Sequence, residues 1–345
     1  MKTNKSIVVT FAQNRDLVKK NTWSRVGFDS LARAAWVEYQ AEIRQRASVF
    51  APLTQSYFDA RADESFVIPL NSHVPVLLSE VFGELDQDKV KEITIGHLYL
   101  DTFTQVLDDI ADKNERSDEQ IHLSHLLLLE GLRRLQSAIS FSPDVVEKMQ
   151  LVVEDTMAAE RSLWSHKQLA QPYSALDYQI MGRRGGILRC AAHAYGACAS
   201  RPELVPAVEQ ALLSGALAVQ LVDDLLDWQD DLNDHIYTSP LVGALLSLRR
   251  RTADDCNVDD IARALLVSGS ANQTLDRAST ALHNGRSILQ RLGGHALSGL
   301  FQTLQFRLEE LRGAISNLAA LPMDKVTAHI LCECLKRSGD TRLEH

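Results

Sequence analysis

The sequence predicts an all-α protein of one domain, and three features of the chain support this fold class. Apolar residues recur at helical spacing along nearly its whole length, and no stretch shows the sustained alternation of a β-strand. The 9 prolines and 17 glycines fall mostly between these periodic runs, where they separate one helix from the next. No shift in composition marks a boundary, so residues 1–342 are expected to form a single domain. The final Leu343, Glu344 and His345 are typical of a tag remnant.

The expected helices follow one another with short loops, and local signals support some of their ends. Ser142 followed by Pro143 gives a favourable N-cap and first helical residue. Gly185 and Gly186 lie inside one periodic run, where they cost about 1 kcal/mol each relative to alanine and allow a kink. Longer loops are expected at 233–240 and 252–257. In chain order, the expected helices are 17–47 with a break or bend, 74–82, 90–111, 121–139, 143–168, 174–199, 206–230, 241–250, 258–268, 272–292, 295–318 and 323–336.

The composition is that of an ordinary globular protein, with 45% hydrophobic and 23% charged residues. A net charge of −9 and the lack of a dense Lys/Arg patch argue against a nucleic-acid partner. No stretch approaches roughly 18 consecutive apolar residues, so no membrane span is expected. The five cysteines lack metal-site spacing and indicate a reducing compartment, so a cytoplasmic location is expected.

One pattern of acids, Asp-Asp-x-x-Asp, occurs twice, each time in an apolar helical stretch. The two copies are Asp108, Asp109 and Asp112, then Asp223, Asp224 and Asp227. On a helix, the first and last acids of each copy lie one turn apart and share a face, where unpaired carboxylates would repel one another. Mg²⁺ fits such a patch, because it takes one or two carboxylates and fills its other positions with water and substrate phosphate oxygens. Two such patches on facing helices predict a diphosphate-binding cavity.

Other acidic patterns in the chain are interpreted more simply. A third match to the pattern, at Asp230, Asp231 and Asp234, lies where the expected helix ends and is interpreted as surface acid. A lone match is more often a solvated helix face, but the second copy and the apolar neighbours of both copies favour a functional site. Glu119 and His122 form a single E-x-x-H, whereas a di-iron bundle needs two such motifs and further glutamates.

Helical spacing assigns further residues to the predicted cavity. Thr104 shares the face of Asp108, with Phe103 and Tyr99 close to the edge of that face. Gln220 shares the face of Asp223. These positions predict a cavity with an acidic mouth and an apolar or aromatic depth, where cation–π attraction stabilises a carbocation.

Basic residues near the two motifs are candidates for binding the diphosphate. Arg183 and Arg184 lie directly before the paired glycines, and only one of them can readily face the cavity. Arg116 follows the first motif. An arginine can hold a leaving diphosphate by bidentate hydrogen bonds, which makes all three candidates for that role.

Together these residues resemble the trans-isoprenyl diphosphate synthase superfamily, whose fold is also that of class I terpene synthases. The matching features are both acidic motifs, Gln220 ahead of the second, Arg184 as the basic residue between them and, less closely, Arg116. The resemblance runs from about residue 65 to residue 290. It implies an isoprenoid-synthase-type helical bundle around a central cavity.

The resemblance also implies a metal-triggered ionisation. Asp108 and Asp112 would bind two magnesium ions, and Asp223 with Asp227 a third. The three ions and Arg184 would stabilise the departing diphosphate of an allylic substrate. A bulky residue five positions before the first motif limits chain length in elongating relatives. Phe103 at that position implies farnesyl or geranylgeranyl diphosphate.

Departures from the superfamily pattern bear on the reaction. Elongating members carry a G-K-x-x-R-P segment whose basic residues hold isopentenyl diphosphate, whereas residues 70–75 contain no Lys or Arg. Those members also carry a Lys-rich loop after the second motif, whereas residues 231–240 contain none. These losses favour a terpene synthase that ionises one allylic diphosphate and then cyclises the cation or captures it with water.

Two alternatives stay open. The first is a chain-elongating prenyl diphosphate synthase that uses isopentenyl diphosphate, and the second is an inactive helical partner subunit, whose motifs would have decayed. Members commonly form homodimers, and the apolar helix at 121–135 suits either a dimer interface or the core.

Overall fold

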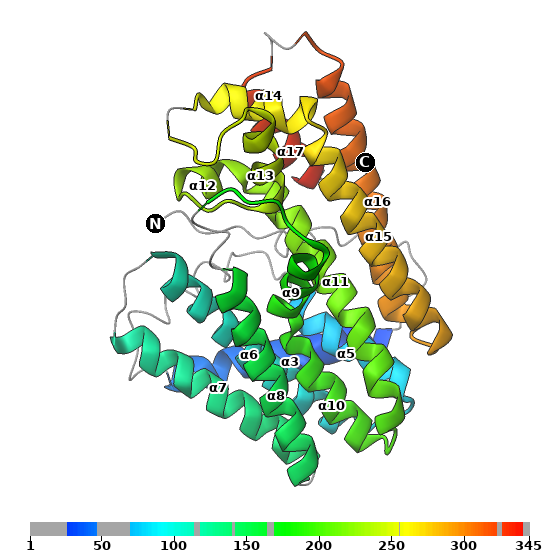
Figure 1. The fold of residues 1–345 in the computed structure, drawn as a ribbon. Helices are drawn as coiled ribbons and strands as arrows, with labels where there is room; N and C mark the ends of the chain where they lie inside the picture. The colour runs from blue at the N-terminus through cyan, green and yellow to red at the C-terminus, as the bar shows by residue number, and fades with distance from the viewer. Residues whose placement is uncertain are drawn as a thin grey trace. The chain divides into compact units, whose positions relative to one another are not determined.

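The structure, a computed structural model, describes residues 26–46, 70–113, 118–139, 142–163, 169–254, 256–322 and 326–340. Within these ranges the chain forms 14 α-helices and two short 3-10 helices, and it contains no strand (Figure 1). The predicted all-α class is therefore confirmed. The packing contacts group the chain into two compact units, which are described separately below.

The first unit is built around one long central helix. It comprises 1–154, 187–209 and 289–297. Its helices are α3 (Val26–Arg46), α5 (Leu70–Phe82), α6 (Gln87–Lys113), α7 (Asp118–Ala138), the first half of α8 (Pro143–Leu163), α10 (Arg189–Cys198) and η3 (Pro202–Leu204). Helix α6 packs against α3, α5, α7 and α10, and its residues are buried on every side from Ile93 to Leu100. This burial explains why α6 lacks the clean polar stripe of a surface helix.

Two glycines allow α6 and α7 to cross closely. A Cβ on Gly131 of α7 would lie 2.8 Å from the Leu100 side chain of α6, and one on Gly96 of α6 would lie 2.9 Å from Leu135 of α7. A glycine of each helix thus lies against a leucine of the other helix. The reciprocal arrangement fixes the position of α6, the helix that carries the first acidic motif, against α7.

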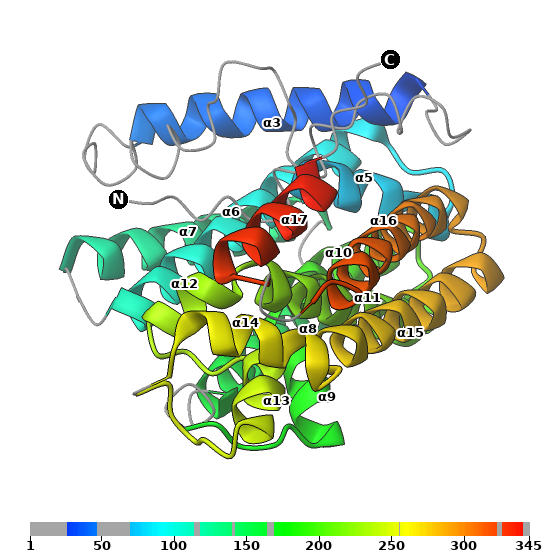
Figure 2. The ribbon, with the colours of Figure 1, turned by 90° about the horizontal axis from the view of Figure 1, so that it is seen from above.

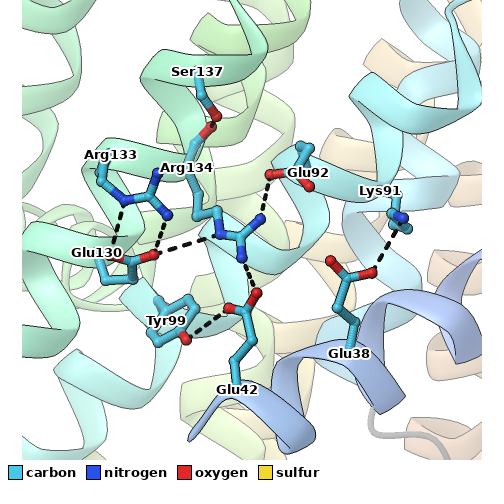
Figure 3. A network of polar contacts seen from close by, with 9 residues as sticks. All are labelled: Glu38, Glu42, Lys91, Glu92, Tyr99, Glu130, Arg133, Arg134 and Ser137. Carbon is cyan, nitrogen blue, oxygen red and sulfur yellow. Dashed lines mark hydrogen bonds and ion pairs between the residues drawn. The ribbon is translucent and has the colours of Figure 1, made fainter. Parts of the chain in front are cut away.

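A buried arginine joins three helices of this unit (Figure 3). Arg134 of α7 forms ion pairs with Glu42 of α3, with Glu92 of α6 at 2.7 Å and with Glu130 of its own helix at 3.5 Å. Its side chain is 13% exposed, and that of Glu130 is 6% exposed. Burial, followed by the charge of Glu38, raises the pKa of Glu92. The network neutralises carboxylates that would otherwise separate α3 from α6.

The second unit comprises 155–186, 210–288 and 298–345. It contains α9 (Ala175–Arg184), most of α11 (Val205–Leu226), α12 (Trp228–Asn233), α13 (Ser239–Ser247), α14 (Val258–Val267), α15 (Ser270–Arg291), α16 (His295–Ala319) and α17 (Ala328–Asp340). Helices α15 and α16 run side by side (Figures 1 and 2). The ring of Phe301 from α16 fills the space beside Gly215 of α11 and Gly285 of α15, where a Cβ would lie 2.5 and 2.6 Å from that ring.

Most predicted helices are present, and the differences follow from local chemistry. The run at 174–199 divides into α9, the 3-10 helix η2 (Gly186–Leu188) and α10, so the kink expected at the paired glycines is confirmed. The run at 206–230 breaks at Asp227, and the loop expected at 233–240 is shortened by the start of α13 at Ser239. Residues 17–25, 47, 164–168 and 323–325 of the predicted helices lie outside the described residues.

One helical stretch, Pro202–Leu226, is long and apolar enough to cross a membrane by length and composition. Its most apolar window has a mean hydropathy of 1.4 and is 44% buried. The sequence analysis looked for an uninterrupted apolar run and therefore did not identify this stretch, which polar residues interrupt. Its mean hydropathy is nevertheless high enough for a membrane span. Core helices of soluble proteins pass the same test, so the stretch is only weak support for a span. It carries the first two acids of the second motif.

We expect Gly131→Ala to lower the free energy of unfolding by about 1–3 kcal/mol, because the new methyl group meets the branch point of Leu100. Denaturant unfolding followed by circular dichroism measures the change. Gly313→Ala in α16 is the matched control, since nothing lies within 4 Å of its Cβ position. That substitution should stabilise the protein by about 0.5–1 kcal/mol. Equal effects of the two changes would contradict the proposed helix crossing.

We expect Arg134→Met to destabilise the protein by about 3–5 kcal/mol, because the change leaves buried carboxylates without their cation. Arg133→Met is the control. Arg133 pairs with the same Glu130 but is 55% exposed, so its loss should cost under about 1 kcal/mol. Chemical denaturation of both variants tests the difference, and similar losses would show that burial of Arg134 does not matter.

Candidate functional site

The second acidic motif lies where α11 ends. Asp223 and Asp224 belong to the last turn of α11, and Asp227 is the residue between α11 and α12. The backbone N–H of Asp227 donates to the carbonyl of Asp223 at 2.9 Å, and the N–H of Asp231 donates to the carbonyl of Asp227 at 3.0 Å. Helical turns therefore continue through the break, and Asp231 follows Asp227 by one turn.

The interpretation of Asp231 as a surface acid is wrong. Asp230 and Asp234 are exposed as expected, but Asp231 is not. Its burial and the charges of Asp224, Asp227 and Asp223 raise the pKa of the Asp231 carboxyl well above its ordinary value. Asp231 therefore lies close enough to the three acids of the second motif for their charges to disfavour ionisation of its carboxyl.

Two polar side chains, one from α11 and one from the segment before α9, interact with this cluster of acids. Gln220, one turn before Asp224, donates from Nε2 to the Oδ1 atom of Asp224 at 2.7 Å. Tyr173, in the segment before α9, is close enough to the cluster that burial, followed by the charge of Asp224, raises its pKa. Arg184 opposes this shift in the pKa of Tyr173. Acid, phenol and guanidinium are therefore near neighbours within the second unit.

Glycines place the two arginines beside α11. A Cβ on Gly182 would lie 2.9 Å from the carbonyl oxygen of Leu213, and one on Gly185 would lie 2.9 Å from the Cβ of Ala216. Helix α9 therefore packs closely on α11 ahead of the second motif. A capping box at Ser174, reciprocated by the side chain of Asp177, fixes the start of α9.

Both arginines form ion pairs with acids of α8. Arg183 pairs with Asp155 at 3.3 Å, and Arg184 pairs with Glu160. Arg184 is the more buried of the two, with 21% of its side chain exposed against 38% for Arg183. Arg184 and Asp224 both act on the pKa of Tyr173, so Arg184 is the stronger candidate for binding a diphosphate there.

The first motif lies at the end of α6, in the first unit. Asp108 is half-buried. Asp109 and Asp112 belong to the same helix, but their side chains, like the whole of Arg116, lie outside the described residues. Thr104, one turn before Asp108, donates its hydroxyl to the carbonyl of Asp101 at 2.8 Å.

The predicted aromatic residues are in the core. Phe103 is 3% exposed and Tyr99 is 1% exposed. The Tyr99 hydroxyl donates to Glu42 of α3 at 3.0 Å, and its ring meets that of Tyr39 edge-on with centroids 5.0 Å apart. Through these contacts Tyr99 packs α6 on α3. Trp228 is 0% exposed and is likewise a packing residue.

The donor set of the acid cluster fits a hard divalent cation. Carboxylate oxygens and a side-chain amide are present, and these are ligands that Mg²⁺ prefers. Among the described residues, no three metal-binding side chains already converge on one point, so the acids do not form a closed cage.

The fold is that of solved prenyl diphosphate synthases. The chain is similar to a decaprenyl diphosphate synthase from Rhodobacter capsulatus, with a TM-score of 0.63, 18% identity and coverage of 81% of this chain and 99% of that one. It is similar to a geranylgeranyl pyrophosphate synthase, with a TM-score of 0.63, 15% identity and coverage of 81% and 98%. It is also similar to a polyprenyl synthase from Caulobacter crescentus CB15 complexed with calcium and isoprenyl diphosphate, with a TM-score of 0.57, 16% identity and coverage of 85% and 97%.

No protein-family model matches the sequence, and no curated protein matches it. The structural likeness therefore establishes the fold, which is the one that the sequence resemblance implied. The Caulobacter protein was solved with a divalent cation and an isoprenyl diphosphate bound to it.

We expect Asp231→Asn to raise the melting temperature in EDTA at pH 8, with a gain that shrinks as the pH falls towards about 4. The sign follows from linkage. An acid whose folded pKa lies above its unfolded value of about 3.8 supports folding below that value, and this support is lost as the pH rises through the folded pKa.

Added Mg²⁺ should reverse the order, because it stabilises the wild type more than the variant. Thermal unfolding across pH, with and without Mg²⁺, measures both effects. The exposed Asp230→Asn is the control and should change neither. A lower melting temperature of Asp231→Asn in EDTA at pH 8 would mean that the acids do not repel.

Proposed function

We propose that the protein is a Mg²⁺-dependent enzyme that acts on an allylic prenyl diphosphate and transfers its prenyl group to isopentenyl diphosphate. One observation carries this proposal: on the fold of prenyl diphosphate synthases, the acids of the second motif act together on Asp231, and Asp224 and Arg184 both act on Tyr173. Cations that bind these acids would offer positive charge to a diphosphate. The structural neighbours support prenyl transfer over the terpene synthase that the sequence alone favours.

Each group has a distinct role in the proposal. Asp223, Asp224 and Asp227 hold divalent cations, and Gln220 orients the Asp224 carboxylate through its hydrogen bond. Arg184 exchanges its partner Glu160 for an oxygen of the diphosphate. The first motif, with Asp108, Asp109 and Asp112, is proposed to bind further cations, which gives the three ions that the resemblance implies. Bound Mg²⁺ supplies the positive charge that stabilises the departing diphosphate.

The proposed reaction needs no nucleophilic side chain. The C1–O bond of the allylic substrate breaks, and its electron pair leaves with the diphosphate. The double bond of isopentenyl diphosphate supplies the electrons of the new carbon–carbon bond. Loss of a proton to the released diphosphate then restores a double bond. Arg184 stabilises the diphosphate as its charge develops.

A second candidate is the terpene synthase reaction, in which one allylic diphosphate ionises and cyclises or reacts with water. A specific observation favours it. Helix α5 contains no Lys or Arg from Leu70 to Phe82, and the segment after the second motif contains none from Asp231 to Pro240. A second diphosphate therefore has no cationic partner at those two places.

The substrate length, the subunit state and the location stay predictions. Buried Phe103 near the first motif is consistent with farnesyl or geranylgeranyl diphosphate as allylic substrate. Leu129 of α7 is 68% exposed, which suits the proposed homodimer through that helix. A cytoplasmic location is proposed from the free cysteines alone.

We expect the purified protein with Mg²⁺ to make a longer prenyl diphosphate from farnesyl or geranylgeranyl diphosphate only when isopentenyl diphosphate is present. Asp224→Asn should lower turnover by about 10²–10³-fold, the usual loss when one group that stabilises a transition state is removed. Product mass and released pyrophosphate are the measurements.

The exposed Asp230→Asn serves as control and should keep full activity. A hydrocarbon or alcohol formed from the allylic substrate alone would establish the second candidate instead. Absence of turnover with every prenyl diphosphate would overturn both.

A further inference from the structure

Two arginine–carboxylate ion pairs join the last turn of α9 to α8, and all four residues belong to the second unit. Arg184 pairs through Nε with Glu160, and Arg183 pairs with Asp155 at 3.3 Å. In the first pair both side chains are 21% exposed, whereas in the second they are 38% and 30% exposed. The two pairs have the same chemistry on the same two helices, but the pair of Arg184 with Glu160 is the more enclosed.

Packing holds the backbones of both partners. Glu160 lies between two buried positions of α8, Thr156 one turn before it at 5% exposed and Leu163 about one turn after it at 6% exposed. Arg184 lies directly before Gly185, which approaches Ala216 of α11 so closely that an added Cβ would lie 2.9 Å from it. The guanidinium, at the end of a long side chain, is therefore the part of the pair that can change its partner.

The charge of Arg184 acts near the second motif although its partner lies on α8. Arg184 and Asp224 act with opposite sign on the pKa of Tyr173. The Tyr173 hydroxyl donates to the carbonyl of Tyr237 at 3.2 Å, which fixes this tyrosine beside the segment that follows the motif. An ion pair that is partly open to water adds little to stability, so the fold does not need Glu160 for its strength. The position of Glu160 bears instead on how strongly Arg184 binds another anion.

We infer that Glu160 competes with diphosphate for Arg184 and thereby limits the affinity of the protein for its diphosphate ligands. This inference rests on the proposed function, in which Arg184 binds diphosphate. Carboxylate and phosphate oxygens accept hydrogen bonds from the same edge of a guanidinium, so the two anions exclude each other at the edge that carries Nε. The affinity for diphosphate then falls by the fraction of molecules in which Arg184 has left Glu160. Glu160 is a positioning residue, because it acts through Arg184 and not on the substrate.

The competition matters most for the pyrophosphate that the proposed reaction releases. This product carries the same groups that bind the substrate, and strong binding of it would block the next turnover. The return of Glu160 to Arg184 removes one of the interactions that hold pyrophosphate. Glu160 therefore weakens the binding of the allylic substrate and, for the same reason, speeds the release of the product.

Isothermal titration calorimetry with inorganic pyrophosphate and Mg²⁺ tests the competition. Glu160→Gln should bind pyrophosphate about tenfold more tightly than the wild type, the gain expected if Arg184 pairs with Glu160 for about nine-tenths of the time. Misfolding would weaken binding and cannot produce this gain. Asp155→Asn is the matched control, because it removes the same charge from the same helix and leaves Arg183 without that partner. Its affinity should change by less than about twofold. Unchanged binding in Glu160→Gln, or equal gains in both variants, would overturn the inference.

A double variant shows whether the effect passes through Arg184. Arg184→Met should weaken pyrophosphate binding, and the addition of Glu160→Gln to that variant should cause no further change. A gain of affinity from Glu160→Gln that persists without Arg184 would mean that the acid acts on the ligand directly, and the inference would be wrong.

Kinetics distinguish failure of this inference from failure of the proposed function. With an allylic prenyl diphosphate and isopentenyl diphosphate as substrates, Glu160→Gln should lower the inhibition constant of pyrophosphate about tenfold and lower the KM for the allylic substrate. If the wild type turns over no prenyl diphosphate but Glu160→Gln still gains affinity for pyrophosphate through Arg184, the inference stands and the proposed function fails. If turnover occurs as proposed but Glu160→Gln binds pyrophosphate as the wild type does, the inference alone fails.

Discussion

Repulsion among the carboxylates at the end of α11 is the constraint on which the arrangement of the second unit depends. Asp223, Asp224, Asp227 and Asp231 are held together by helical turns that continue across the break at Asp227. Separation of these acids would relieve the repulsion, and the backbone does not allow it. Close packing through Gly215, against the ring of Phe301, holds α11 in place instead. The pKa of Asp231 is raised by this repulsion together with the burial of its carboxyl.

Two groups of acids in the chain have different surroundings. The contrast indicates a structural role for the first group and a functional role for the second. Around Arg134, three glutamates from three helices meet a guanidinium that is only 13% exposed, so the charges cancel within the fold. At the second motif, the nearby Arg184 pairs with Glu160 of α8. The fold neutralises the glutamates around Arg134, whereas the charges of the second motif raise the pKa of the neighbouring Asp231. Such an arrangement favours a ligand that brings positive charge.

Sequence periodicity and composition predicted the helices, and the repeated motif predicted the acids, because both signals are local. The role of Asp231, the fourth acid, was not predicted, because it belongs to the same sequence pattern as the exposed Asp230 and Asp234. Only the path of the chain through Asp227 makes its surroundings differ from theirs. Helical spacing likewise could not show that Tyr99 contacts Glu42 of α3, which lies 57 residues away in sequence. The pairing of Arg184 with Glu160 and the hydrogen bond of Tyr173 with Tyr237 also join distant segments. Local patterns carry no information on such contacts.

The two candidate reactions differ in the number of anions that the protein must hold at once, so charge balance bears on the choice between them. Acids with bound cations serve one diphosphate. A second diphosphate brought near the first would be repelled unless fixed positive charge lay within reach. Neither α5 nor the segment after the second motif supplies that charge, which is why the sequence alone favours the single-substrate reaction.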